Sequence, residues 1–175
     1  MEQKNKVPIT VFAGGLPIGG GHPVRLQTMW KAPLSEGVFT ETVRKVELLA
    51  SYGCELLRFA VPDADTAALL CRMQDNVSIP LVADIHFDHT LALICLDKLP
   101  KIRINPGNIG SAHKVREVVR KAADKGAAIR VGVNAGSLPA HLRNEDDVAA
   151  AMVSAAEEDL QILDSLGFQN VLFSL

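Results

Sequence analysis

Two short apolar runs, residues 81–88 and 101–110, contain or end in side chains that could do chemistry. Strands of a parallel sheet that is covered on both faces read as nearly continuous apolar runs. A charged side chain in such a run needs a partner, because burying an unpaired charge is costly. The candidate site residues of the two runs are Asp84, His86, Arg103 and Asn105.

Strand residues two positions apart lie on the same face, so the candidates of each run point the same way. Neighbouring strand-like runs add Arg58, Arg130 and Asn134. Arginine stays charged and binds phosphate or carboxylate groups through two parallel hydrogen bonds. Three converging arginines therefore predict a site for a multiply charged anion, either a diphosphate or a carboxylate-rich ligand. The simpler alternative is that Asp84 only neutralises Arg103 in a structural ion pair.

The elements that must position these residues alternate between strand and helix. Apolar runs predict strands at residues 24–29, 56–61, 81–85, 102–105 and 129–134, and another from residue 171. Helical periodicity predicts helices at residues 40–52, 64–74, 90–95, 114–125 and 145–166. This alternation predicts an α/β fold, a (β/α)8 TIM-type barrel with its active site at the carboxyl ends of the strands.

The N-terminal residues depart from this alternation. Residues 7–11 and 16–18 predict a β-hairpin that covers the barrel floor. The glycines at 19–21 predict a turn, because no helix and no Lys-Ser/Thr pair follow them. We expect a hairpin or extension at 1–22 and a barrel domain at 23–175. A closed barrel typically needs about 250 residues, so about six β/α units of an incomplete barrel are expected here.

Composition excludes several classes of function. A net charge of −2 and an aromatic content of 5% give neither the basic field nor the stacking surface of a nucleic-acid-binding protein. No run approaches the roughly 20 apolar residues that span a bilayer. No signal-peptide core follows Met1, so we expect a cytoplasmic protein with no membrane partner. Cys54, Cys71 and Cys95 lack the spacing of zinc or iron–sulfur ligands, so no metal site is expected.

The two apolar runs resemble those of 4-hydroxy-3-methylbut-2-enyl diphosphate synthase, as do RFAVPD at 58–63 and IRVGVNAGSL at 129–138. The resemblance implies an oxidoreductase of isoprene biosynthesis by the non-mevalonate pathway. The implied reaction is the reductive ring opening of 2-C-methyl-D-erythritol 2,4-cyclodiphosphate. The barrel is implied to be the part of the enzyme that binds this small cyclic diphosphate.

The resemblance also implies parts that are not expected in these 175 residues. Members of the family hold a [4Fe–4S] cluster in a separate C-terminal iron–sulfur domain, and they take electrons from flavodoxin or ferredoxin. The implied assembly is a homodimer in which the cluster domain of one subunit caps the barrel of the other. We therefore expect an enzyme as part of a full-length protein, and we expect the 175-residue chain alone to be inactive.

The resemblance assigns roles to the candidate residues. Five are implied to bind substrate: Arg58, Arg103, Asn105, Arg130 and Asn134. Two are candidates for catalytic roles: His86 and Asp84. The arginines are implied to grip the diphosphate, with His86 and Asn134 helping to position it. Asp84 and Asn105 are implied to orient the arginines or the hydroxyl groups of the ligand.

Residues 30–33, WKAP, depart from the family pattern, which has a Thr/Asn-rich turn ending in acidic residues at this place. Two alternatives to the main interpretation remain open. One is a pterin-binding TIM barrel of the dihydropteroate synthase type, which shares the fold and an anion-accepting mouth. The other is a non-catalytic fragment that binds diphosphate or serves assembly through its open sheet edge.

Overall fold

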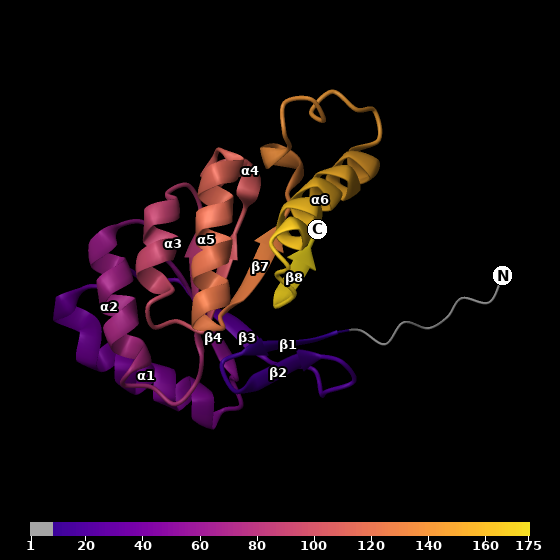
Figure 1. Cartoon of the computed structure of the whole chain (residues 1–175). Coiled ribbons are helices and arrows are strands. Elements are labelled where there is room, and N and C mark those ends of the chain that lie inside the picture. The colour runs from indigo at the N-terminus through magenta and orange to yellow at the C-terminus, as the bar shows by residue number, and fades with distance from the viewer. Residues whose placement is uncertain (1–8) are drawn as a thin grey trace.

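The structure is a computed structural model that describes residues 9–175. Its main sheet is parallel, and its strands follow one another in chain order (Figure 1). The strands are β3 (Gln27–Trp30), β4 (Leu56–Ala60), β5 (Leu81–Ile85), β6 (Lys101–Ile104), β7 (Ala128–Gly132) and β8 (Val171–Ser174). Within the described residues β3 and β8 are the two edges of this sheet, so the barrel is not closed.

Helices cover the outer face of the sheet, and α2, α3 and α5 stand side by side in Figure 1. The longer helices are α1 (Phe39–Ser51), α2 (Ala64–Gln74), α3 (His89–Cys95), α5 (Ala112–Lys125) and α6 (Val148–Ser165). Three short helical segments are η1 (Glu36–Val38), α4 (Pro106–Ile109) and η2 (Ala135–Ser137). The apolar core lies between the helices and the sheet. The alternating α/β architecture predicted from the sequence is confirmed.

Local sequence signals explain several helix ends. The Asp63 side chain accepts a hydrogen bond from the Thr66 backbone amide at 2.8 Å, which caps the start of α2. Gly126 ends α5 in the left-handed conformation, with φ of 66°, where a side chain would be strained. The buried face of α5 consists of Val115, Val118, Val119 and Ala122, at the spacing of an amphipathic helix.

The N-terminal hairpin packs against the amino-terminal end of the sheet, at the lower edge of Figure 1. Its strands are β1 (Thr10–Ala13) and β2 (Leu16–Gly19). Ala13 packs on Leu56 and Val82, near the amino-terminal ends of β4 and β5. The Asn170 side chain exchanges hydrogen bonds of 2.8 and 2.9 Å with the backbone of Phe12. The predicted hairpin is confirmed, and residues 7 and 8 of its first strand lie outside the described residues.

Two predicted element starts in the barrel are wrong by three residues, and the others there agree with the structure to within two. The first barrel strand begins at Gln27 rather than at residue 24, because Glu55 binds the Arg25 side chain and the Leu26 amide just before it. The last helix begins at Val148 rather than at residue 145. The acidic residues 145–147 lie before the helix and not in its first turn, and the last of them, Asp147, caps it.

The strand register determines which side chains share a level on the inner face. Arg58 and Lys101 lie on one level, each paired with the same residue of β5. One level nearer the carboxyl ends, Asp84 pairs with Arg103, and Arg103 pairs with Arg130. Paired residues of neighbouring strands point to the same face. Charged residues of β4 to β7 therefore lie together on the inner face of the sheet, which is the face opposite the helices.

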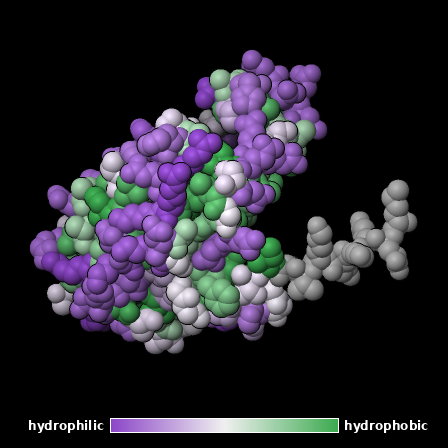
Figure 2. All heavy atoms as spheres, viewed as in Figure 1, coloured by the Kyte–Doolittle hydropathy of each residue, from purple (hydrophilic) through white to green (hydrophobic). Residues whose placement is uncertain are grey.

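The outer surface gives no indication of a membrane span. Within residues 9–175 no helix is long and apolar enough to cross a bilayer. Figure 2 shows mainly hydrophilic residues over the outer helices, with smaller apolar areas between them. The helices thus present polar faces outward and apolar faces to the sheet.

Candidate anion-binding site

Asp84, near the carboxyl end of β5, is the centre of the site. Its side chain is only 5% exposed, and its Oδ1 atom accepts a hydrogen bond of 3.0 Å from Nη1 of Arg103. Its Oδ2 atom lies 3.6 Å from Nε of Arg58, and Nε2 of His86 lies 3.6 Å from Oδ1. Asp84 does pair with Arg103, as the simpler alternative required. It is also shared with a second arginine, which goes beyond a single structural pair.

Arg130 brings a third guanidinium to the same face. Its Nε donates a hydrogen bond of 3.1 Å to Oγ of Ser174. Burial lowers the pKa of Arg130, and the positive charges of Arg58 and Arg103 lower it further, while Asp84 opposes the change. Arg58 and Arg103 contact the buried carboxylate of Asp84, and Arg130 is near enough to feel its charge. The resulting excess of positive charge favours the binding of an anion.

Arg58 carries a hydrogen-bond donor that is not satisfied. Its Nη2 contacts the thioether sulfur of Met29 at 3.2 Å, which is a weak acceptor. Its Nε is buried and has no hydrogen-bond partner among the described residues, because Asp84 lies too far away at 3.6 Å. A buried donor without a partner costs about 1–3 kcal/mol.

Gly132 leaves the space that the Arg103 guanidinium occupies. A Cβ atom built at Gly132 would lie 2.7 Å from Nη2 and 2.8 Å from Nε of Arg103. A side chain at this position would force the guanidinium to move, so the glycine is what lets Arg103 lie beside Asp84. The sequence places Gly132 between Arg130 and Asn134 on one face of the strand, but it does not predict that this glycine makes room for Arg103.

Asn105 joins two loops. It is 3% exposed, and its Nδ2 donates a hydrogen bond of 2.6 Å to Oγ of Ser137 in the loop after β7. Ser137 Oγ in turn donates to the backbone oxygen of Asn134 at 3.1 Å. The backbone of Gly107 lies close to this loop, since a Cβ atom at Gly107 would be 2.5 Å from the backbone oxygen of Ser137. Asn105 thus fixes the backbone next to Asn134, whose exposed side chain stands at the carboxyl end of β7.

His86 lies at the mouth of the site. Its side chain is half exposed and lines a cavity of about 300 Å³ together with Ala60, Phe87 and Leu91. Phe87 is 72% exposed, with its ring centre 6.0 Å from that of the histidine. His86 is therefore placed to contact both Asp84 and a ligand that enters from the mouth.

Residues 30–33 are the segment that departs from the family pattern, and the first of them, Trp30, does not face the inner side of the sheet. Trp30 pairs with Phe59 in register and stacks on it with ring centres 5.7 Å apart. Both rings pack with the core on the helix side of the sheet. Lys31 and Pro33 line a neighbouring cavity of about 290 Å³. Trp30 therefore strengthens the outer core and does not enter the arginine cluster.

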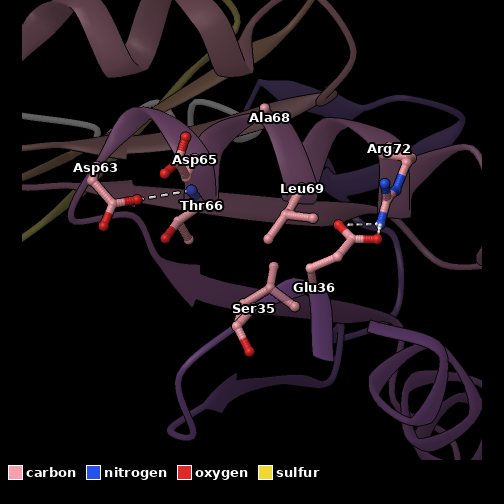
Figure 3. Close-up of a pocket in the computed structure, with 9 residues that line it drawn as sticks. Ser35, Glu36, Asp63, Asp65, Thr66, Ala68, Leu69 and Arg72 are labelled. Carbon is pink, nitrogen blue, oxygen red and sulfur yellow. Dashed lines mark hydrogen bonds and ion pairs between the residues drawn. The ribbon is translucent and has the colours of Figure 1, made fainter. Parts of the chain in front are cut away.

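A larger cavity of about 570 Å³ lies on the outside, between η1 and α2 (Figure 3). It is lined by Glu36, Asp63 and Asp65, and Arg72 is bound to Glu36 at 2.8 Å. None of the predicted site residues lines it. Its acidic wall does not suit an anion, so size alone does not identify the site here.

The cysteines do not form a cluster site. Cys71 and Cys95 lie on adjacent outer helices, with the Cys71 sulfur 3.8 Å from the Cys95 backbone oxygen, and Cys54 precedes β4. The neighbouring Cys71 and, after it, burial raise the pKa of Cys95, which disfavours the thiolate that ligates metals. Among residues 9–175 no group of three or more His, Cys, Asp or Glu side chains could hold a metal ion. These residues do not fit the ligands of a [4Fe–4S] cluster.

Comparison with known protein families identifies the family to which this fold belongs. The family model of the GcpE TIM-barrel domain matches residues 9–175. The chain belongs to this family. The GcpE barrel therefore accounts for the parallel strands, the outer helices and the hairpin, and the predicted fold class and family resemblance are confirmed.

Curated relatives carry the name that the resemblance suggested. The chain is 40% identical to the "4-hydroxy-3-methylbut-2-en-1-yl diphosphate synthase (flavodoxin)" of Treponema denticola, over 97% of this chain and 51% of the relative. It is 43% identical to the protein of the same name from Treponema pallidum, over 91% of this chain and 43% of the relative. The GcpE barrel described here thus spans about half the length of the curated relatives it matches.

Solved structures of dihydropteroate synthase share the fold. The Yersinia pestis enzyme superposes with a TM-score of 0.67 at 11% identity, over 94% of this chain and 61% of the other. The Xanthomonas albilineans enzyme, solved with 7,8-dihydropteroate, gives a TM-score of 0.68 at 15% identity, over 94% and 64%. At such identities only the fold is shared. The sequence relationship favours the diphosphate synthase over the pterin-binding alternative.

Proposed function

We propose that this GcpE barrel binds the diphosphate of 2-C-methyl-D-erythritol 2,4-cyclodiphosphate for its reductive ring opening to 4-hydroxy-3-methylbut-2-enyl diphosphate. The observation that carries the proposal is the convergence of Arg58, Arg103 and Arg130 around the buried Asp84. The relatives' name supports the substrate class, since it states a diphosphate product. The arginine cluster supplies the charge that such a ligand requires.

The residues of this chain bind and orient the substrate in this proposal. The guanidinium groups hold phosphate oxygens, and Asp84 fixes two of those groups in place. His86 reaches the ligand from the mouth, where it can donate or accept a hydrogen bond. Asn105 and Asn134 act at the loop after β7, the first by fixing its backbone and the second by facing the ligand. A preformed cationic site lowers the barrier by orientation and by stabilising developing charge.

The redox step is not assigned to residues of this chain, because the described residues do not fit cluster ligands. We infer that the [4Fe–4S] cluster belongs to the part of the protein that this chain does not span, as the half-length matches to the relatives suggest. Flavodoxin is the proposed electron donor on the basis of the relatives' name, with ferredoxin as the alternative. The homodimer, the cytoplasmic location and the inactivity of the isolated 175 residues stay predictions.

Binding of the cyclic diphosphate to the purified chain tests the proposal. Isothermal titration calorimetry is expected to show binding, and Arg103→Gln is expected to weaken it about tenfold or more, the worth of a lost charge-assisted hydrogen bond. Arg72→Gln is the matched control, because Arg72 lies on the outer face of α2. Equal affinity of the Arg103 variant and the wild type would contradict the proposal. Stabilisation by a pterin with none by the diphosphate would favour the alternative enzyme class.

A further inference from the structure

Lys101 is a buried cation to which the proposed function gives no role. It is the first residue of β6, lies two residues before Arg103 on the same face, and is 5% exposed. Other lysines pair with carboxylates, such as Lys98 with Asp75 at 3.1 Å. No ion pair or side-chain hydrogen bond of Lys101 is found within residues 9–175. Its ammonium nitrogen is not among the fully buried atoms that lack a partner, so the side chain is buried along its length while its charged end faces a cavity. Holding a cation in this largely desolvated place is costly, so its presence calls for an explanation.

The carboxylates near Lys101 are already engaged. Asp84 is held by two arginines, and Glu55 binds Arg25 at 2.8 Å and the amide of Leu26 at 2.9 Å. The charged groups around the interior that Lys101 enters are Arg58, Asp84, Arg103 and Arg130 on the strands, with Arg25 and Glu55 at the floor. Positive groups outnumber negative ones in this set. Lys101 therefore adds to the charge excess of the arginine cluster and does not relieve it.

A cavity lies next to this lysine. It has a volume of about 280 Å³ and is lined by Lys101 and Arg130, with Ser174 on one side and Gln27 and Ile18 on the other. Ile18 belongs to the hairpin that packs on the floor. The cavity therefore extends from the level of Arg130 down to the hairpin, and Lys101 reaches it from β6.

We propose that Lys101 is a fourth cationic ligand of the anion site and contacts a phosphate group that enters the cavity between the arginines and the hairpin. The inference rests on the proposed function and extends it, because it names a residue that recognises the diphosphate from the floor side. The register supports it, since Lys101 and Arg58 lie on the same level of the inner face. A phosphate group in this cavity would meet Lys101 from one strand and Arg130 from the next.

The electrostatics of Lys101 give the proposal a distinctive signature. Burial lowers the pKa of Lys101 to about 8, and the charges of Arg130 and Arg58 contribute to this lowering. A bound anion stabilises the ammonium form and raises this pKa. Diphosphate binding near or above that pH should therefore take up a proton at Lys101. A lysine that is only structural would give no such uptake.

The test is calorimetric titration of inorganic diphosphate into the wild-type chain, Lys101→Met and Lys101→Arg, in buffers of different ionisation enthalpy at about pH 7 and about pH 9. The wild type is expected to bind less tightly at the higher pH and to take up protons there. Lys101→Met is expected to weaken binding about tenfold or more at the lower pH. Lys101→Arg is expected to take up fewer protons than the wild type at the higher pH, because arginine stays charged at both pH values and only the titration of the diphosphate itself remains. Lys45→Met on the exposed side of α1 is the matched control.

Each outcome decides between the proposals. Unchanged affinity and unchanged proton uptake in Lys101→Met, with weakened binding in Arg103→Gln, would overturn the role of Lys101 and leave the proposed function standing. Absence of diphosphate binding by the wild type would overturn both. If Lys101→Met does not fold, as circular dichroism would show, the Lys101→Arg comparison still decides. Proton uptake in that variant equal to that of the wild type would contradict the inference.

Discussion

The two faces of the same strands have opposite character. On β6, Ile102 and Ile104 point to the helices and are fully buried in the apolar core, whereas Lys101 and Arg103 point to the inner face. The period of two along a strand makes this division possible without any change in the backbone. The outer face stabilises the fold, and the inner face concentrates charge at a cost in stability. Substitutions on one face should therefore change stability, and substitutions on the other should change ligand binding.

The largest expected loss of stability comes from replacing Asp84, the carboxylate that offsets the positive charge of Arg58 and Arg103 on the inner face. Asp84→Asn removes the charge that Arg58 and Arg103 share, and should lower the free energy of unfolding by about 3–5 kcal/mol. Urea denaturation measures this loss. Added diphosphate should restore stability, because a ligand that binds only the folded state stabilises it by mass action. A variant as stable as the wild type would show that the arginines do not depend on Asp84.

On the outer face, Ile102→Ala is expected to lower the free energy of unfolding by about 2–4 kcal/mol, through lost burial and the cavity left behind. Its folded fraction should bind diphosphate with the wild-type affinity, because the removed atoms face the helices. Urea denaturation and calorimetry on the same sample provide both measurements. A large loss of affinity at conditions where the variant is folded would break the division between the faces.

The sequence predicts the outer face better than the inner one. The bounds of α2 and β5 are those expected from the sequence, since a capping Asp63 and a continuous apolar run are local signals. The residue types of the inner face also predicted the clustering of arginines. Its contacts were beyond local reasoning, because Asn105 reaches Ser137, 32 positions away, and Asp84 serves two arginines from different strands. Such pairings depend on the register between strands, which the pattern of one strand does not specify.

Lys101 should make the stability of the free protein depend on pH. Its pKa falls from 10.5 to about 8 on folding, so the folded state disfavours the ammonium form. The destabilisation is complete below about pH 8, shrinks as the pH rises, and is gone above about 10.5. Below pH 8, Lys101→Met should therefore be more stable than the wild type, by on the order of 1–3 kcal/mol. The difference should close as the pH rises through this window or as diphosphate is added. Urea denaturation at a series of pH values measures it, and a constant difference would contradict the assignment.

The variant with the smallest expected loss of stability, Gly132→Ala, tests whether the position of the Arg103 guanidinium matters in addition to its charge. Gly132→Ala places a methyl group 2.7 Å from Nη2 of Arg103, so the guanidinium must move away from its position beside Asp84. The free energy of unfolding should fall by only about 1–2 kcal/mol, because the arginine side chain can shift. Diphosphate affinity should fall about tenfold, because Arg103 keeps its charge but is no longer oriented to bind the anion. Gly136→Ala is the matched control, because a Cβ there meets nothing within 4 Å. If both variants bind like the wild type, the orientation of Arg103 does not matter and the inner face works by net charge alone.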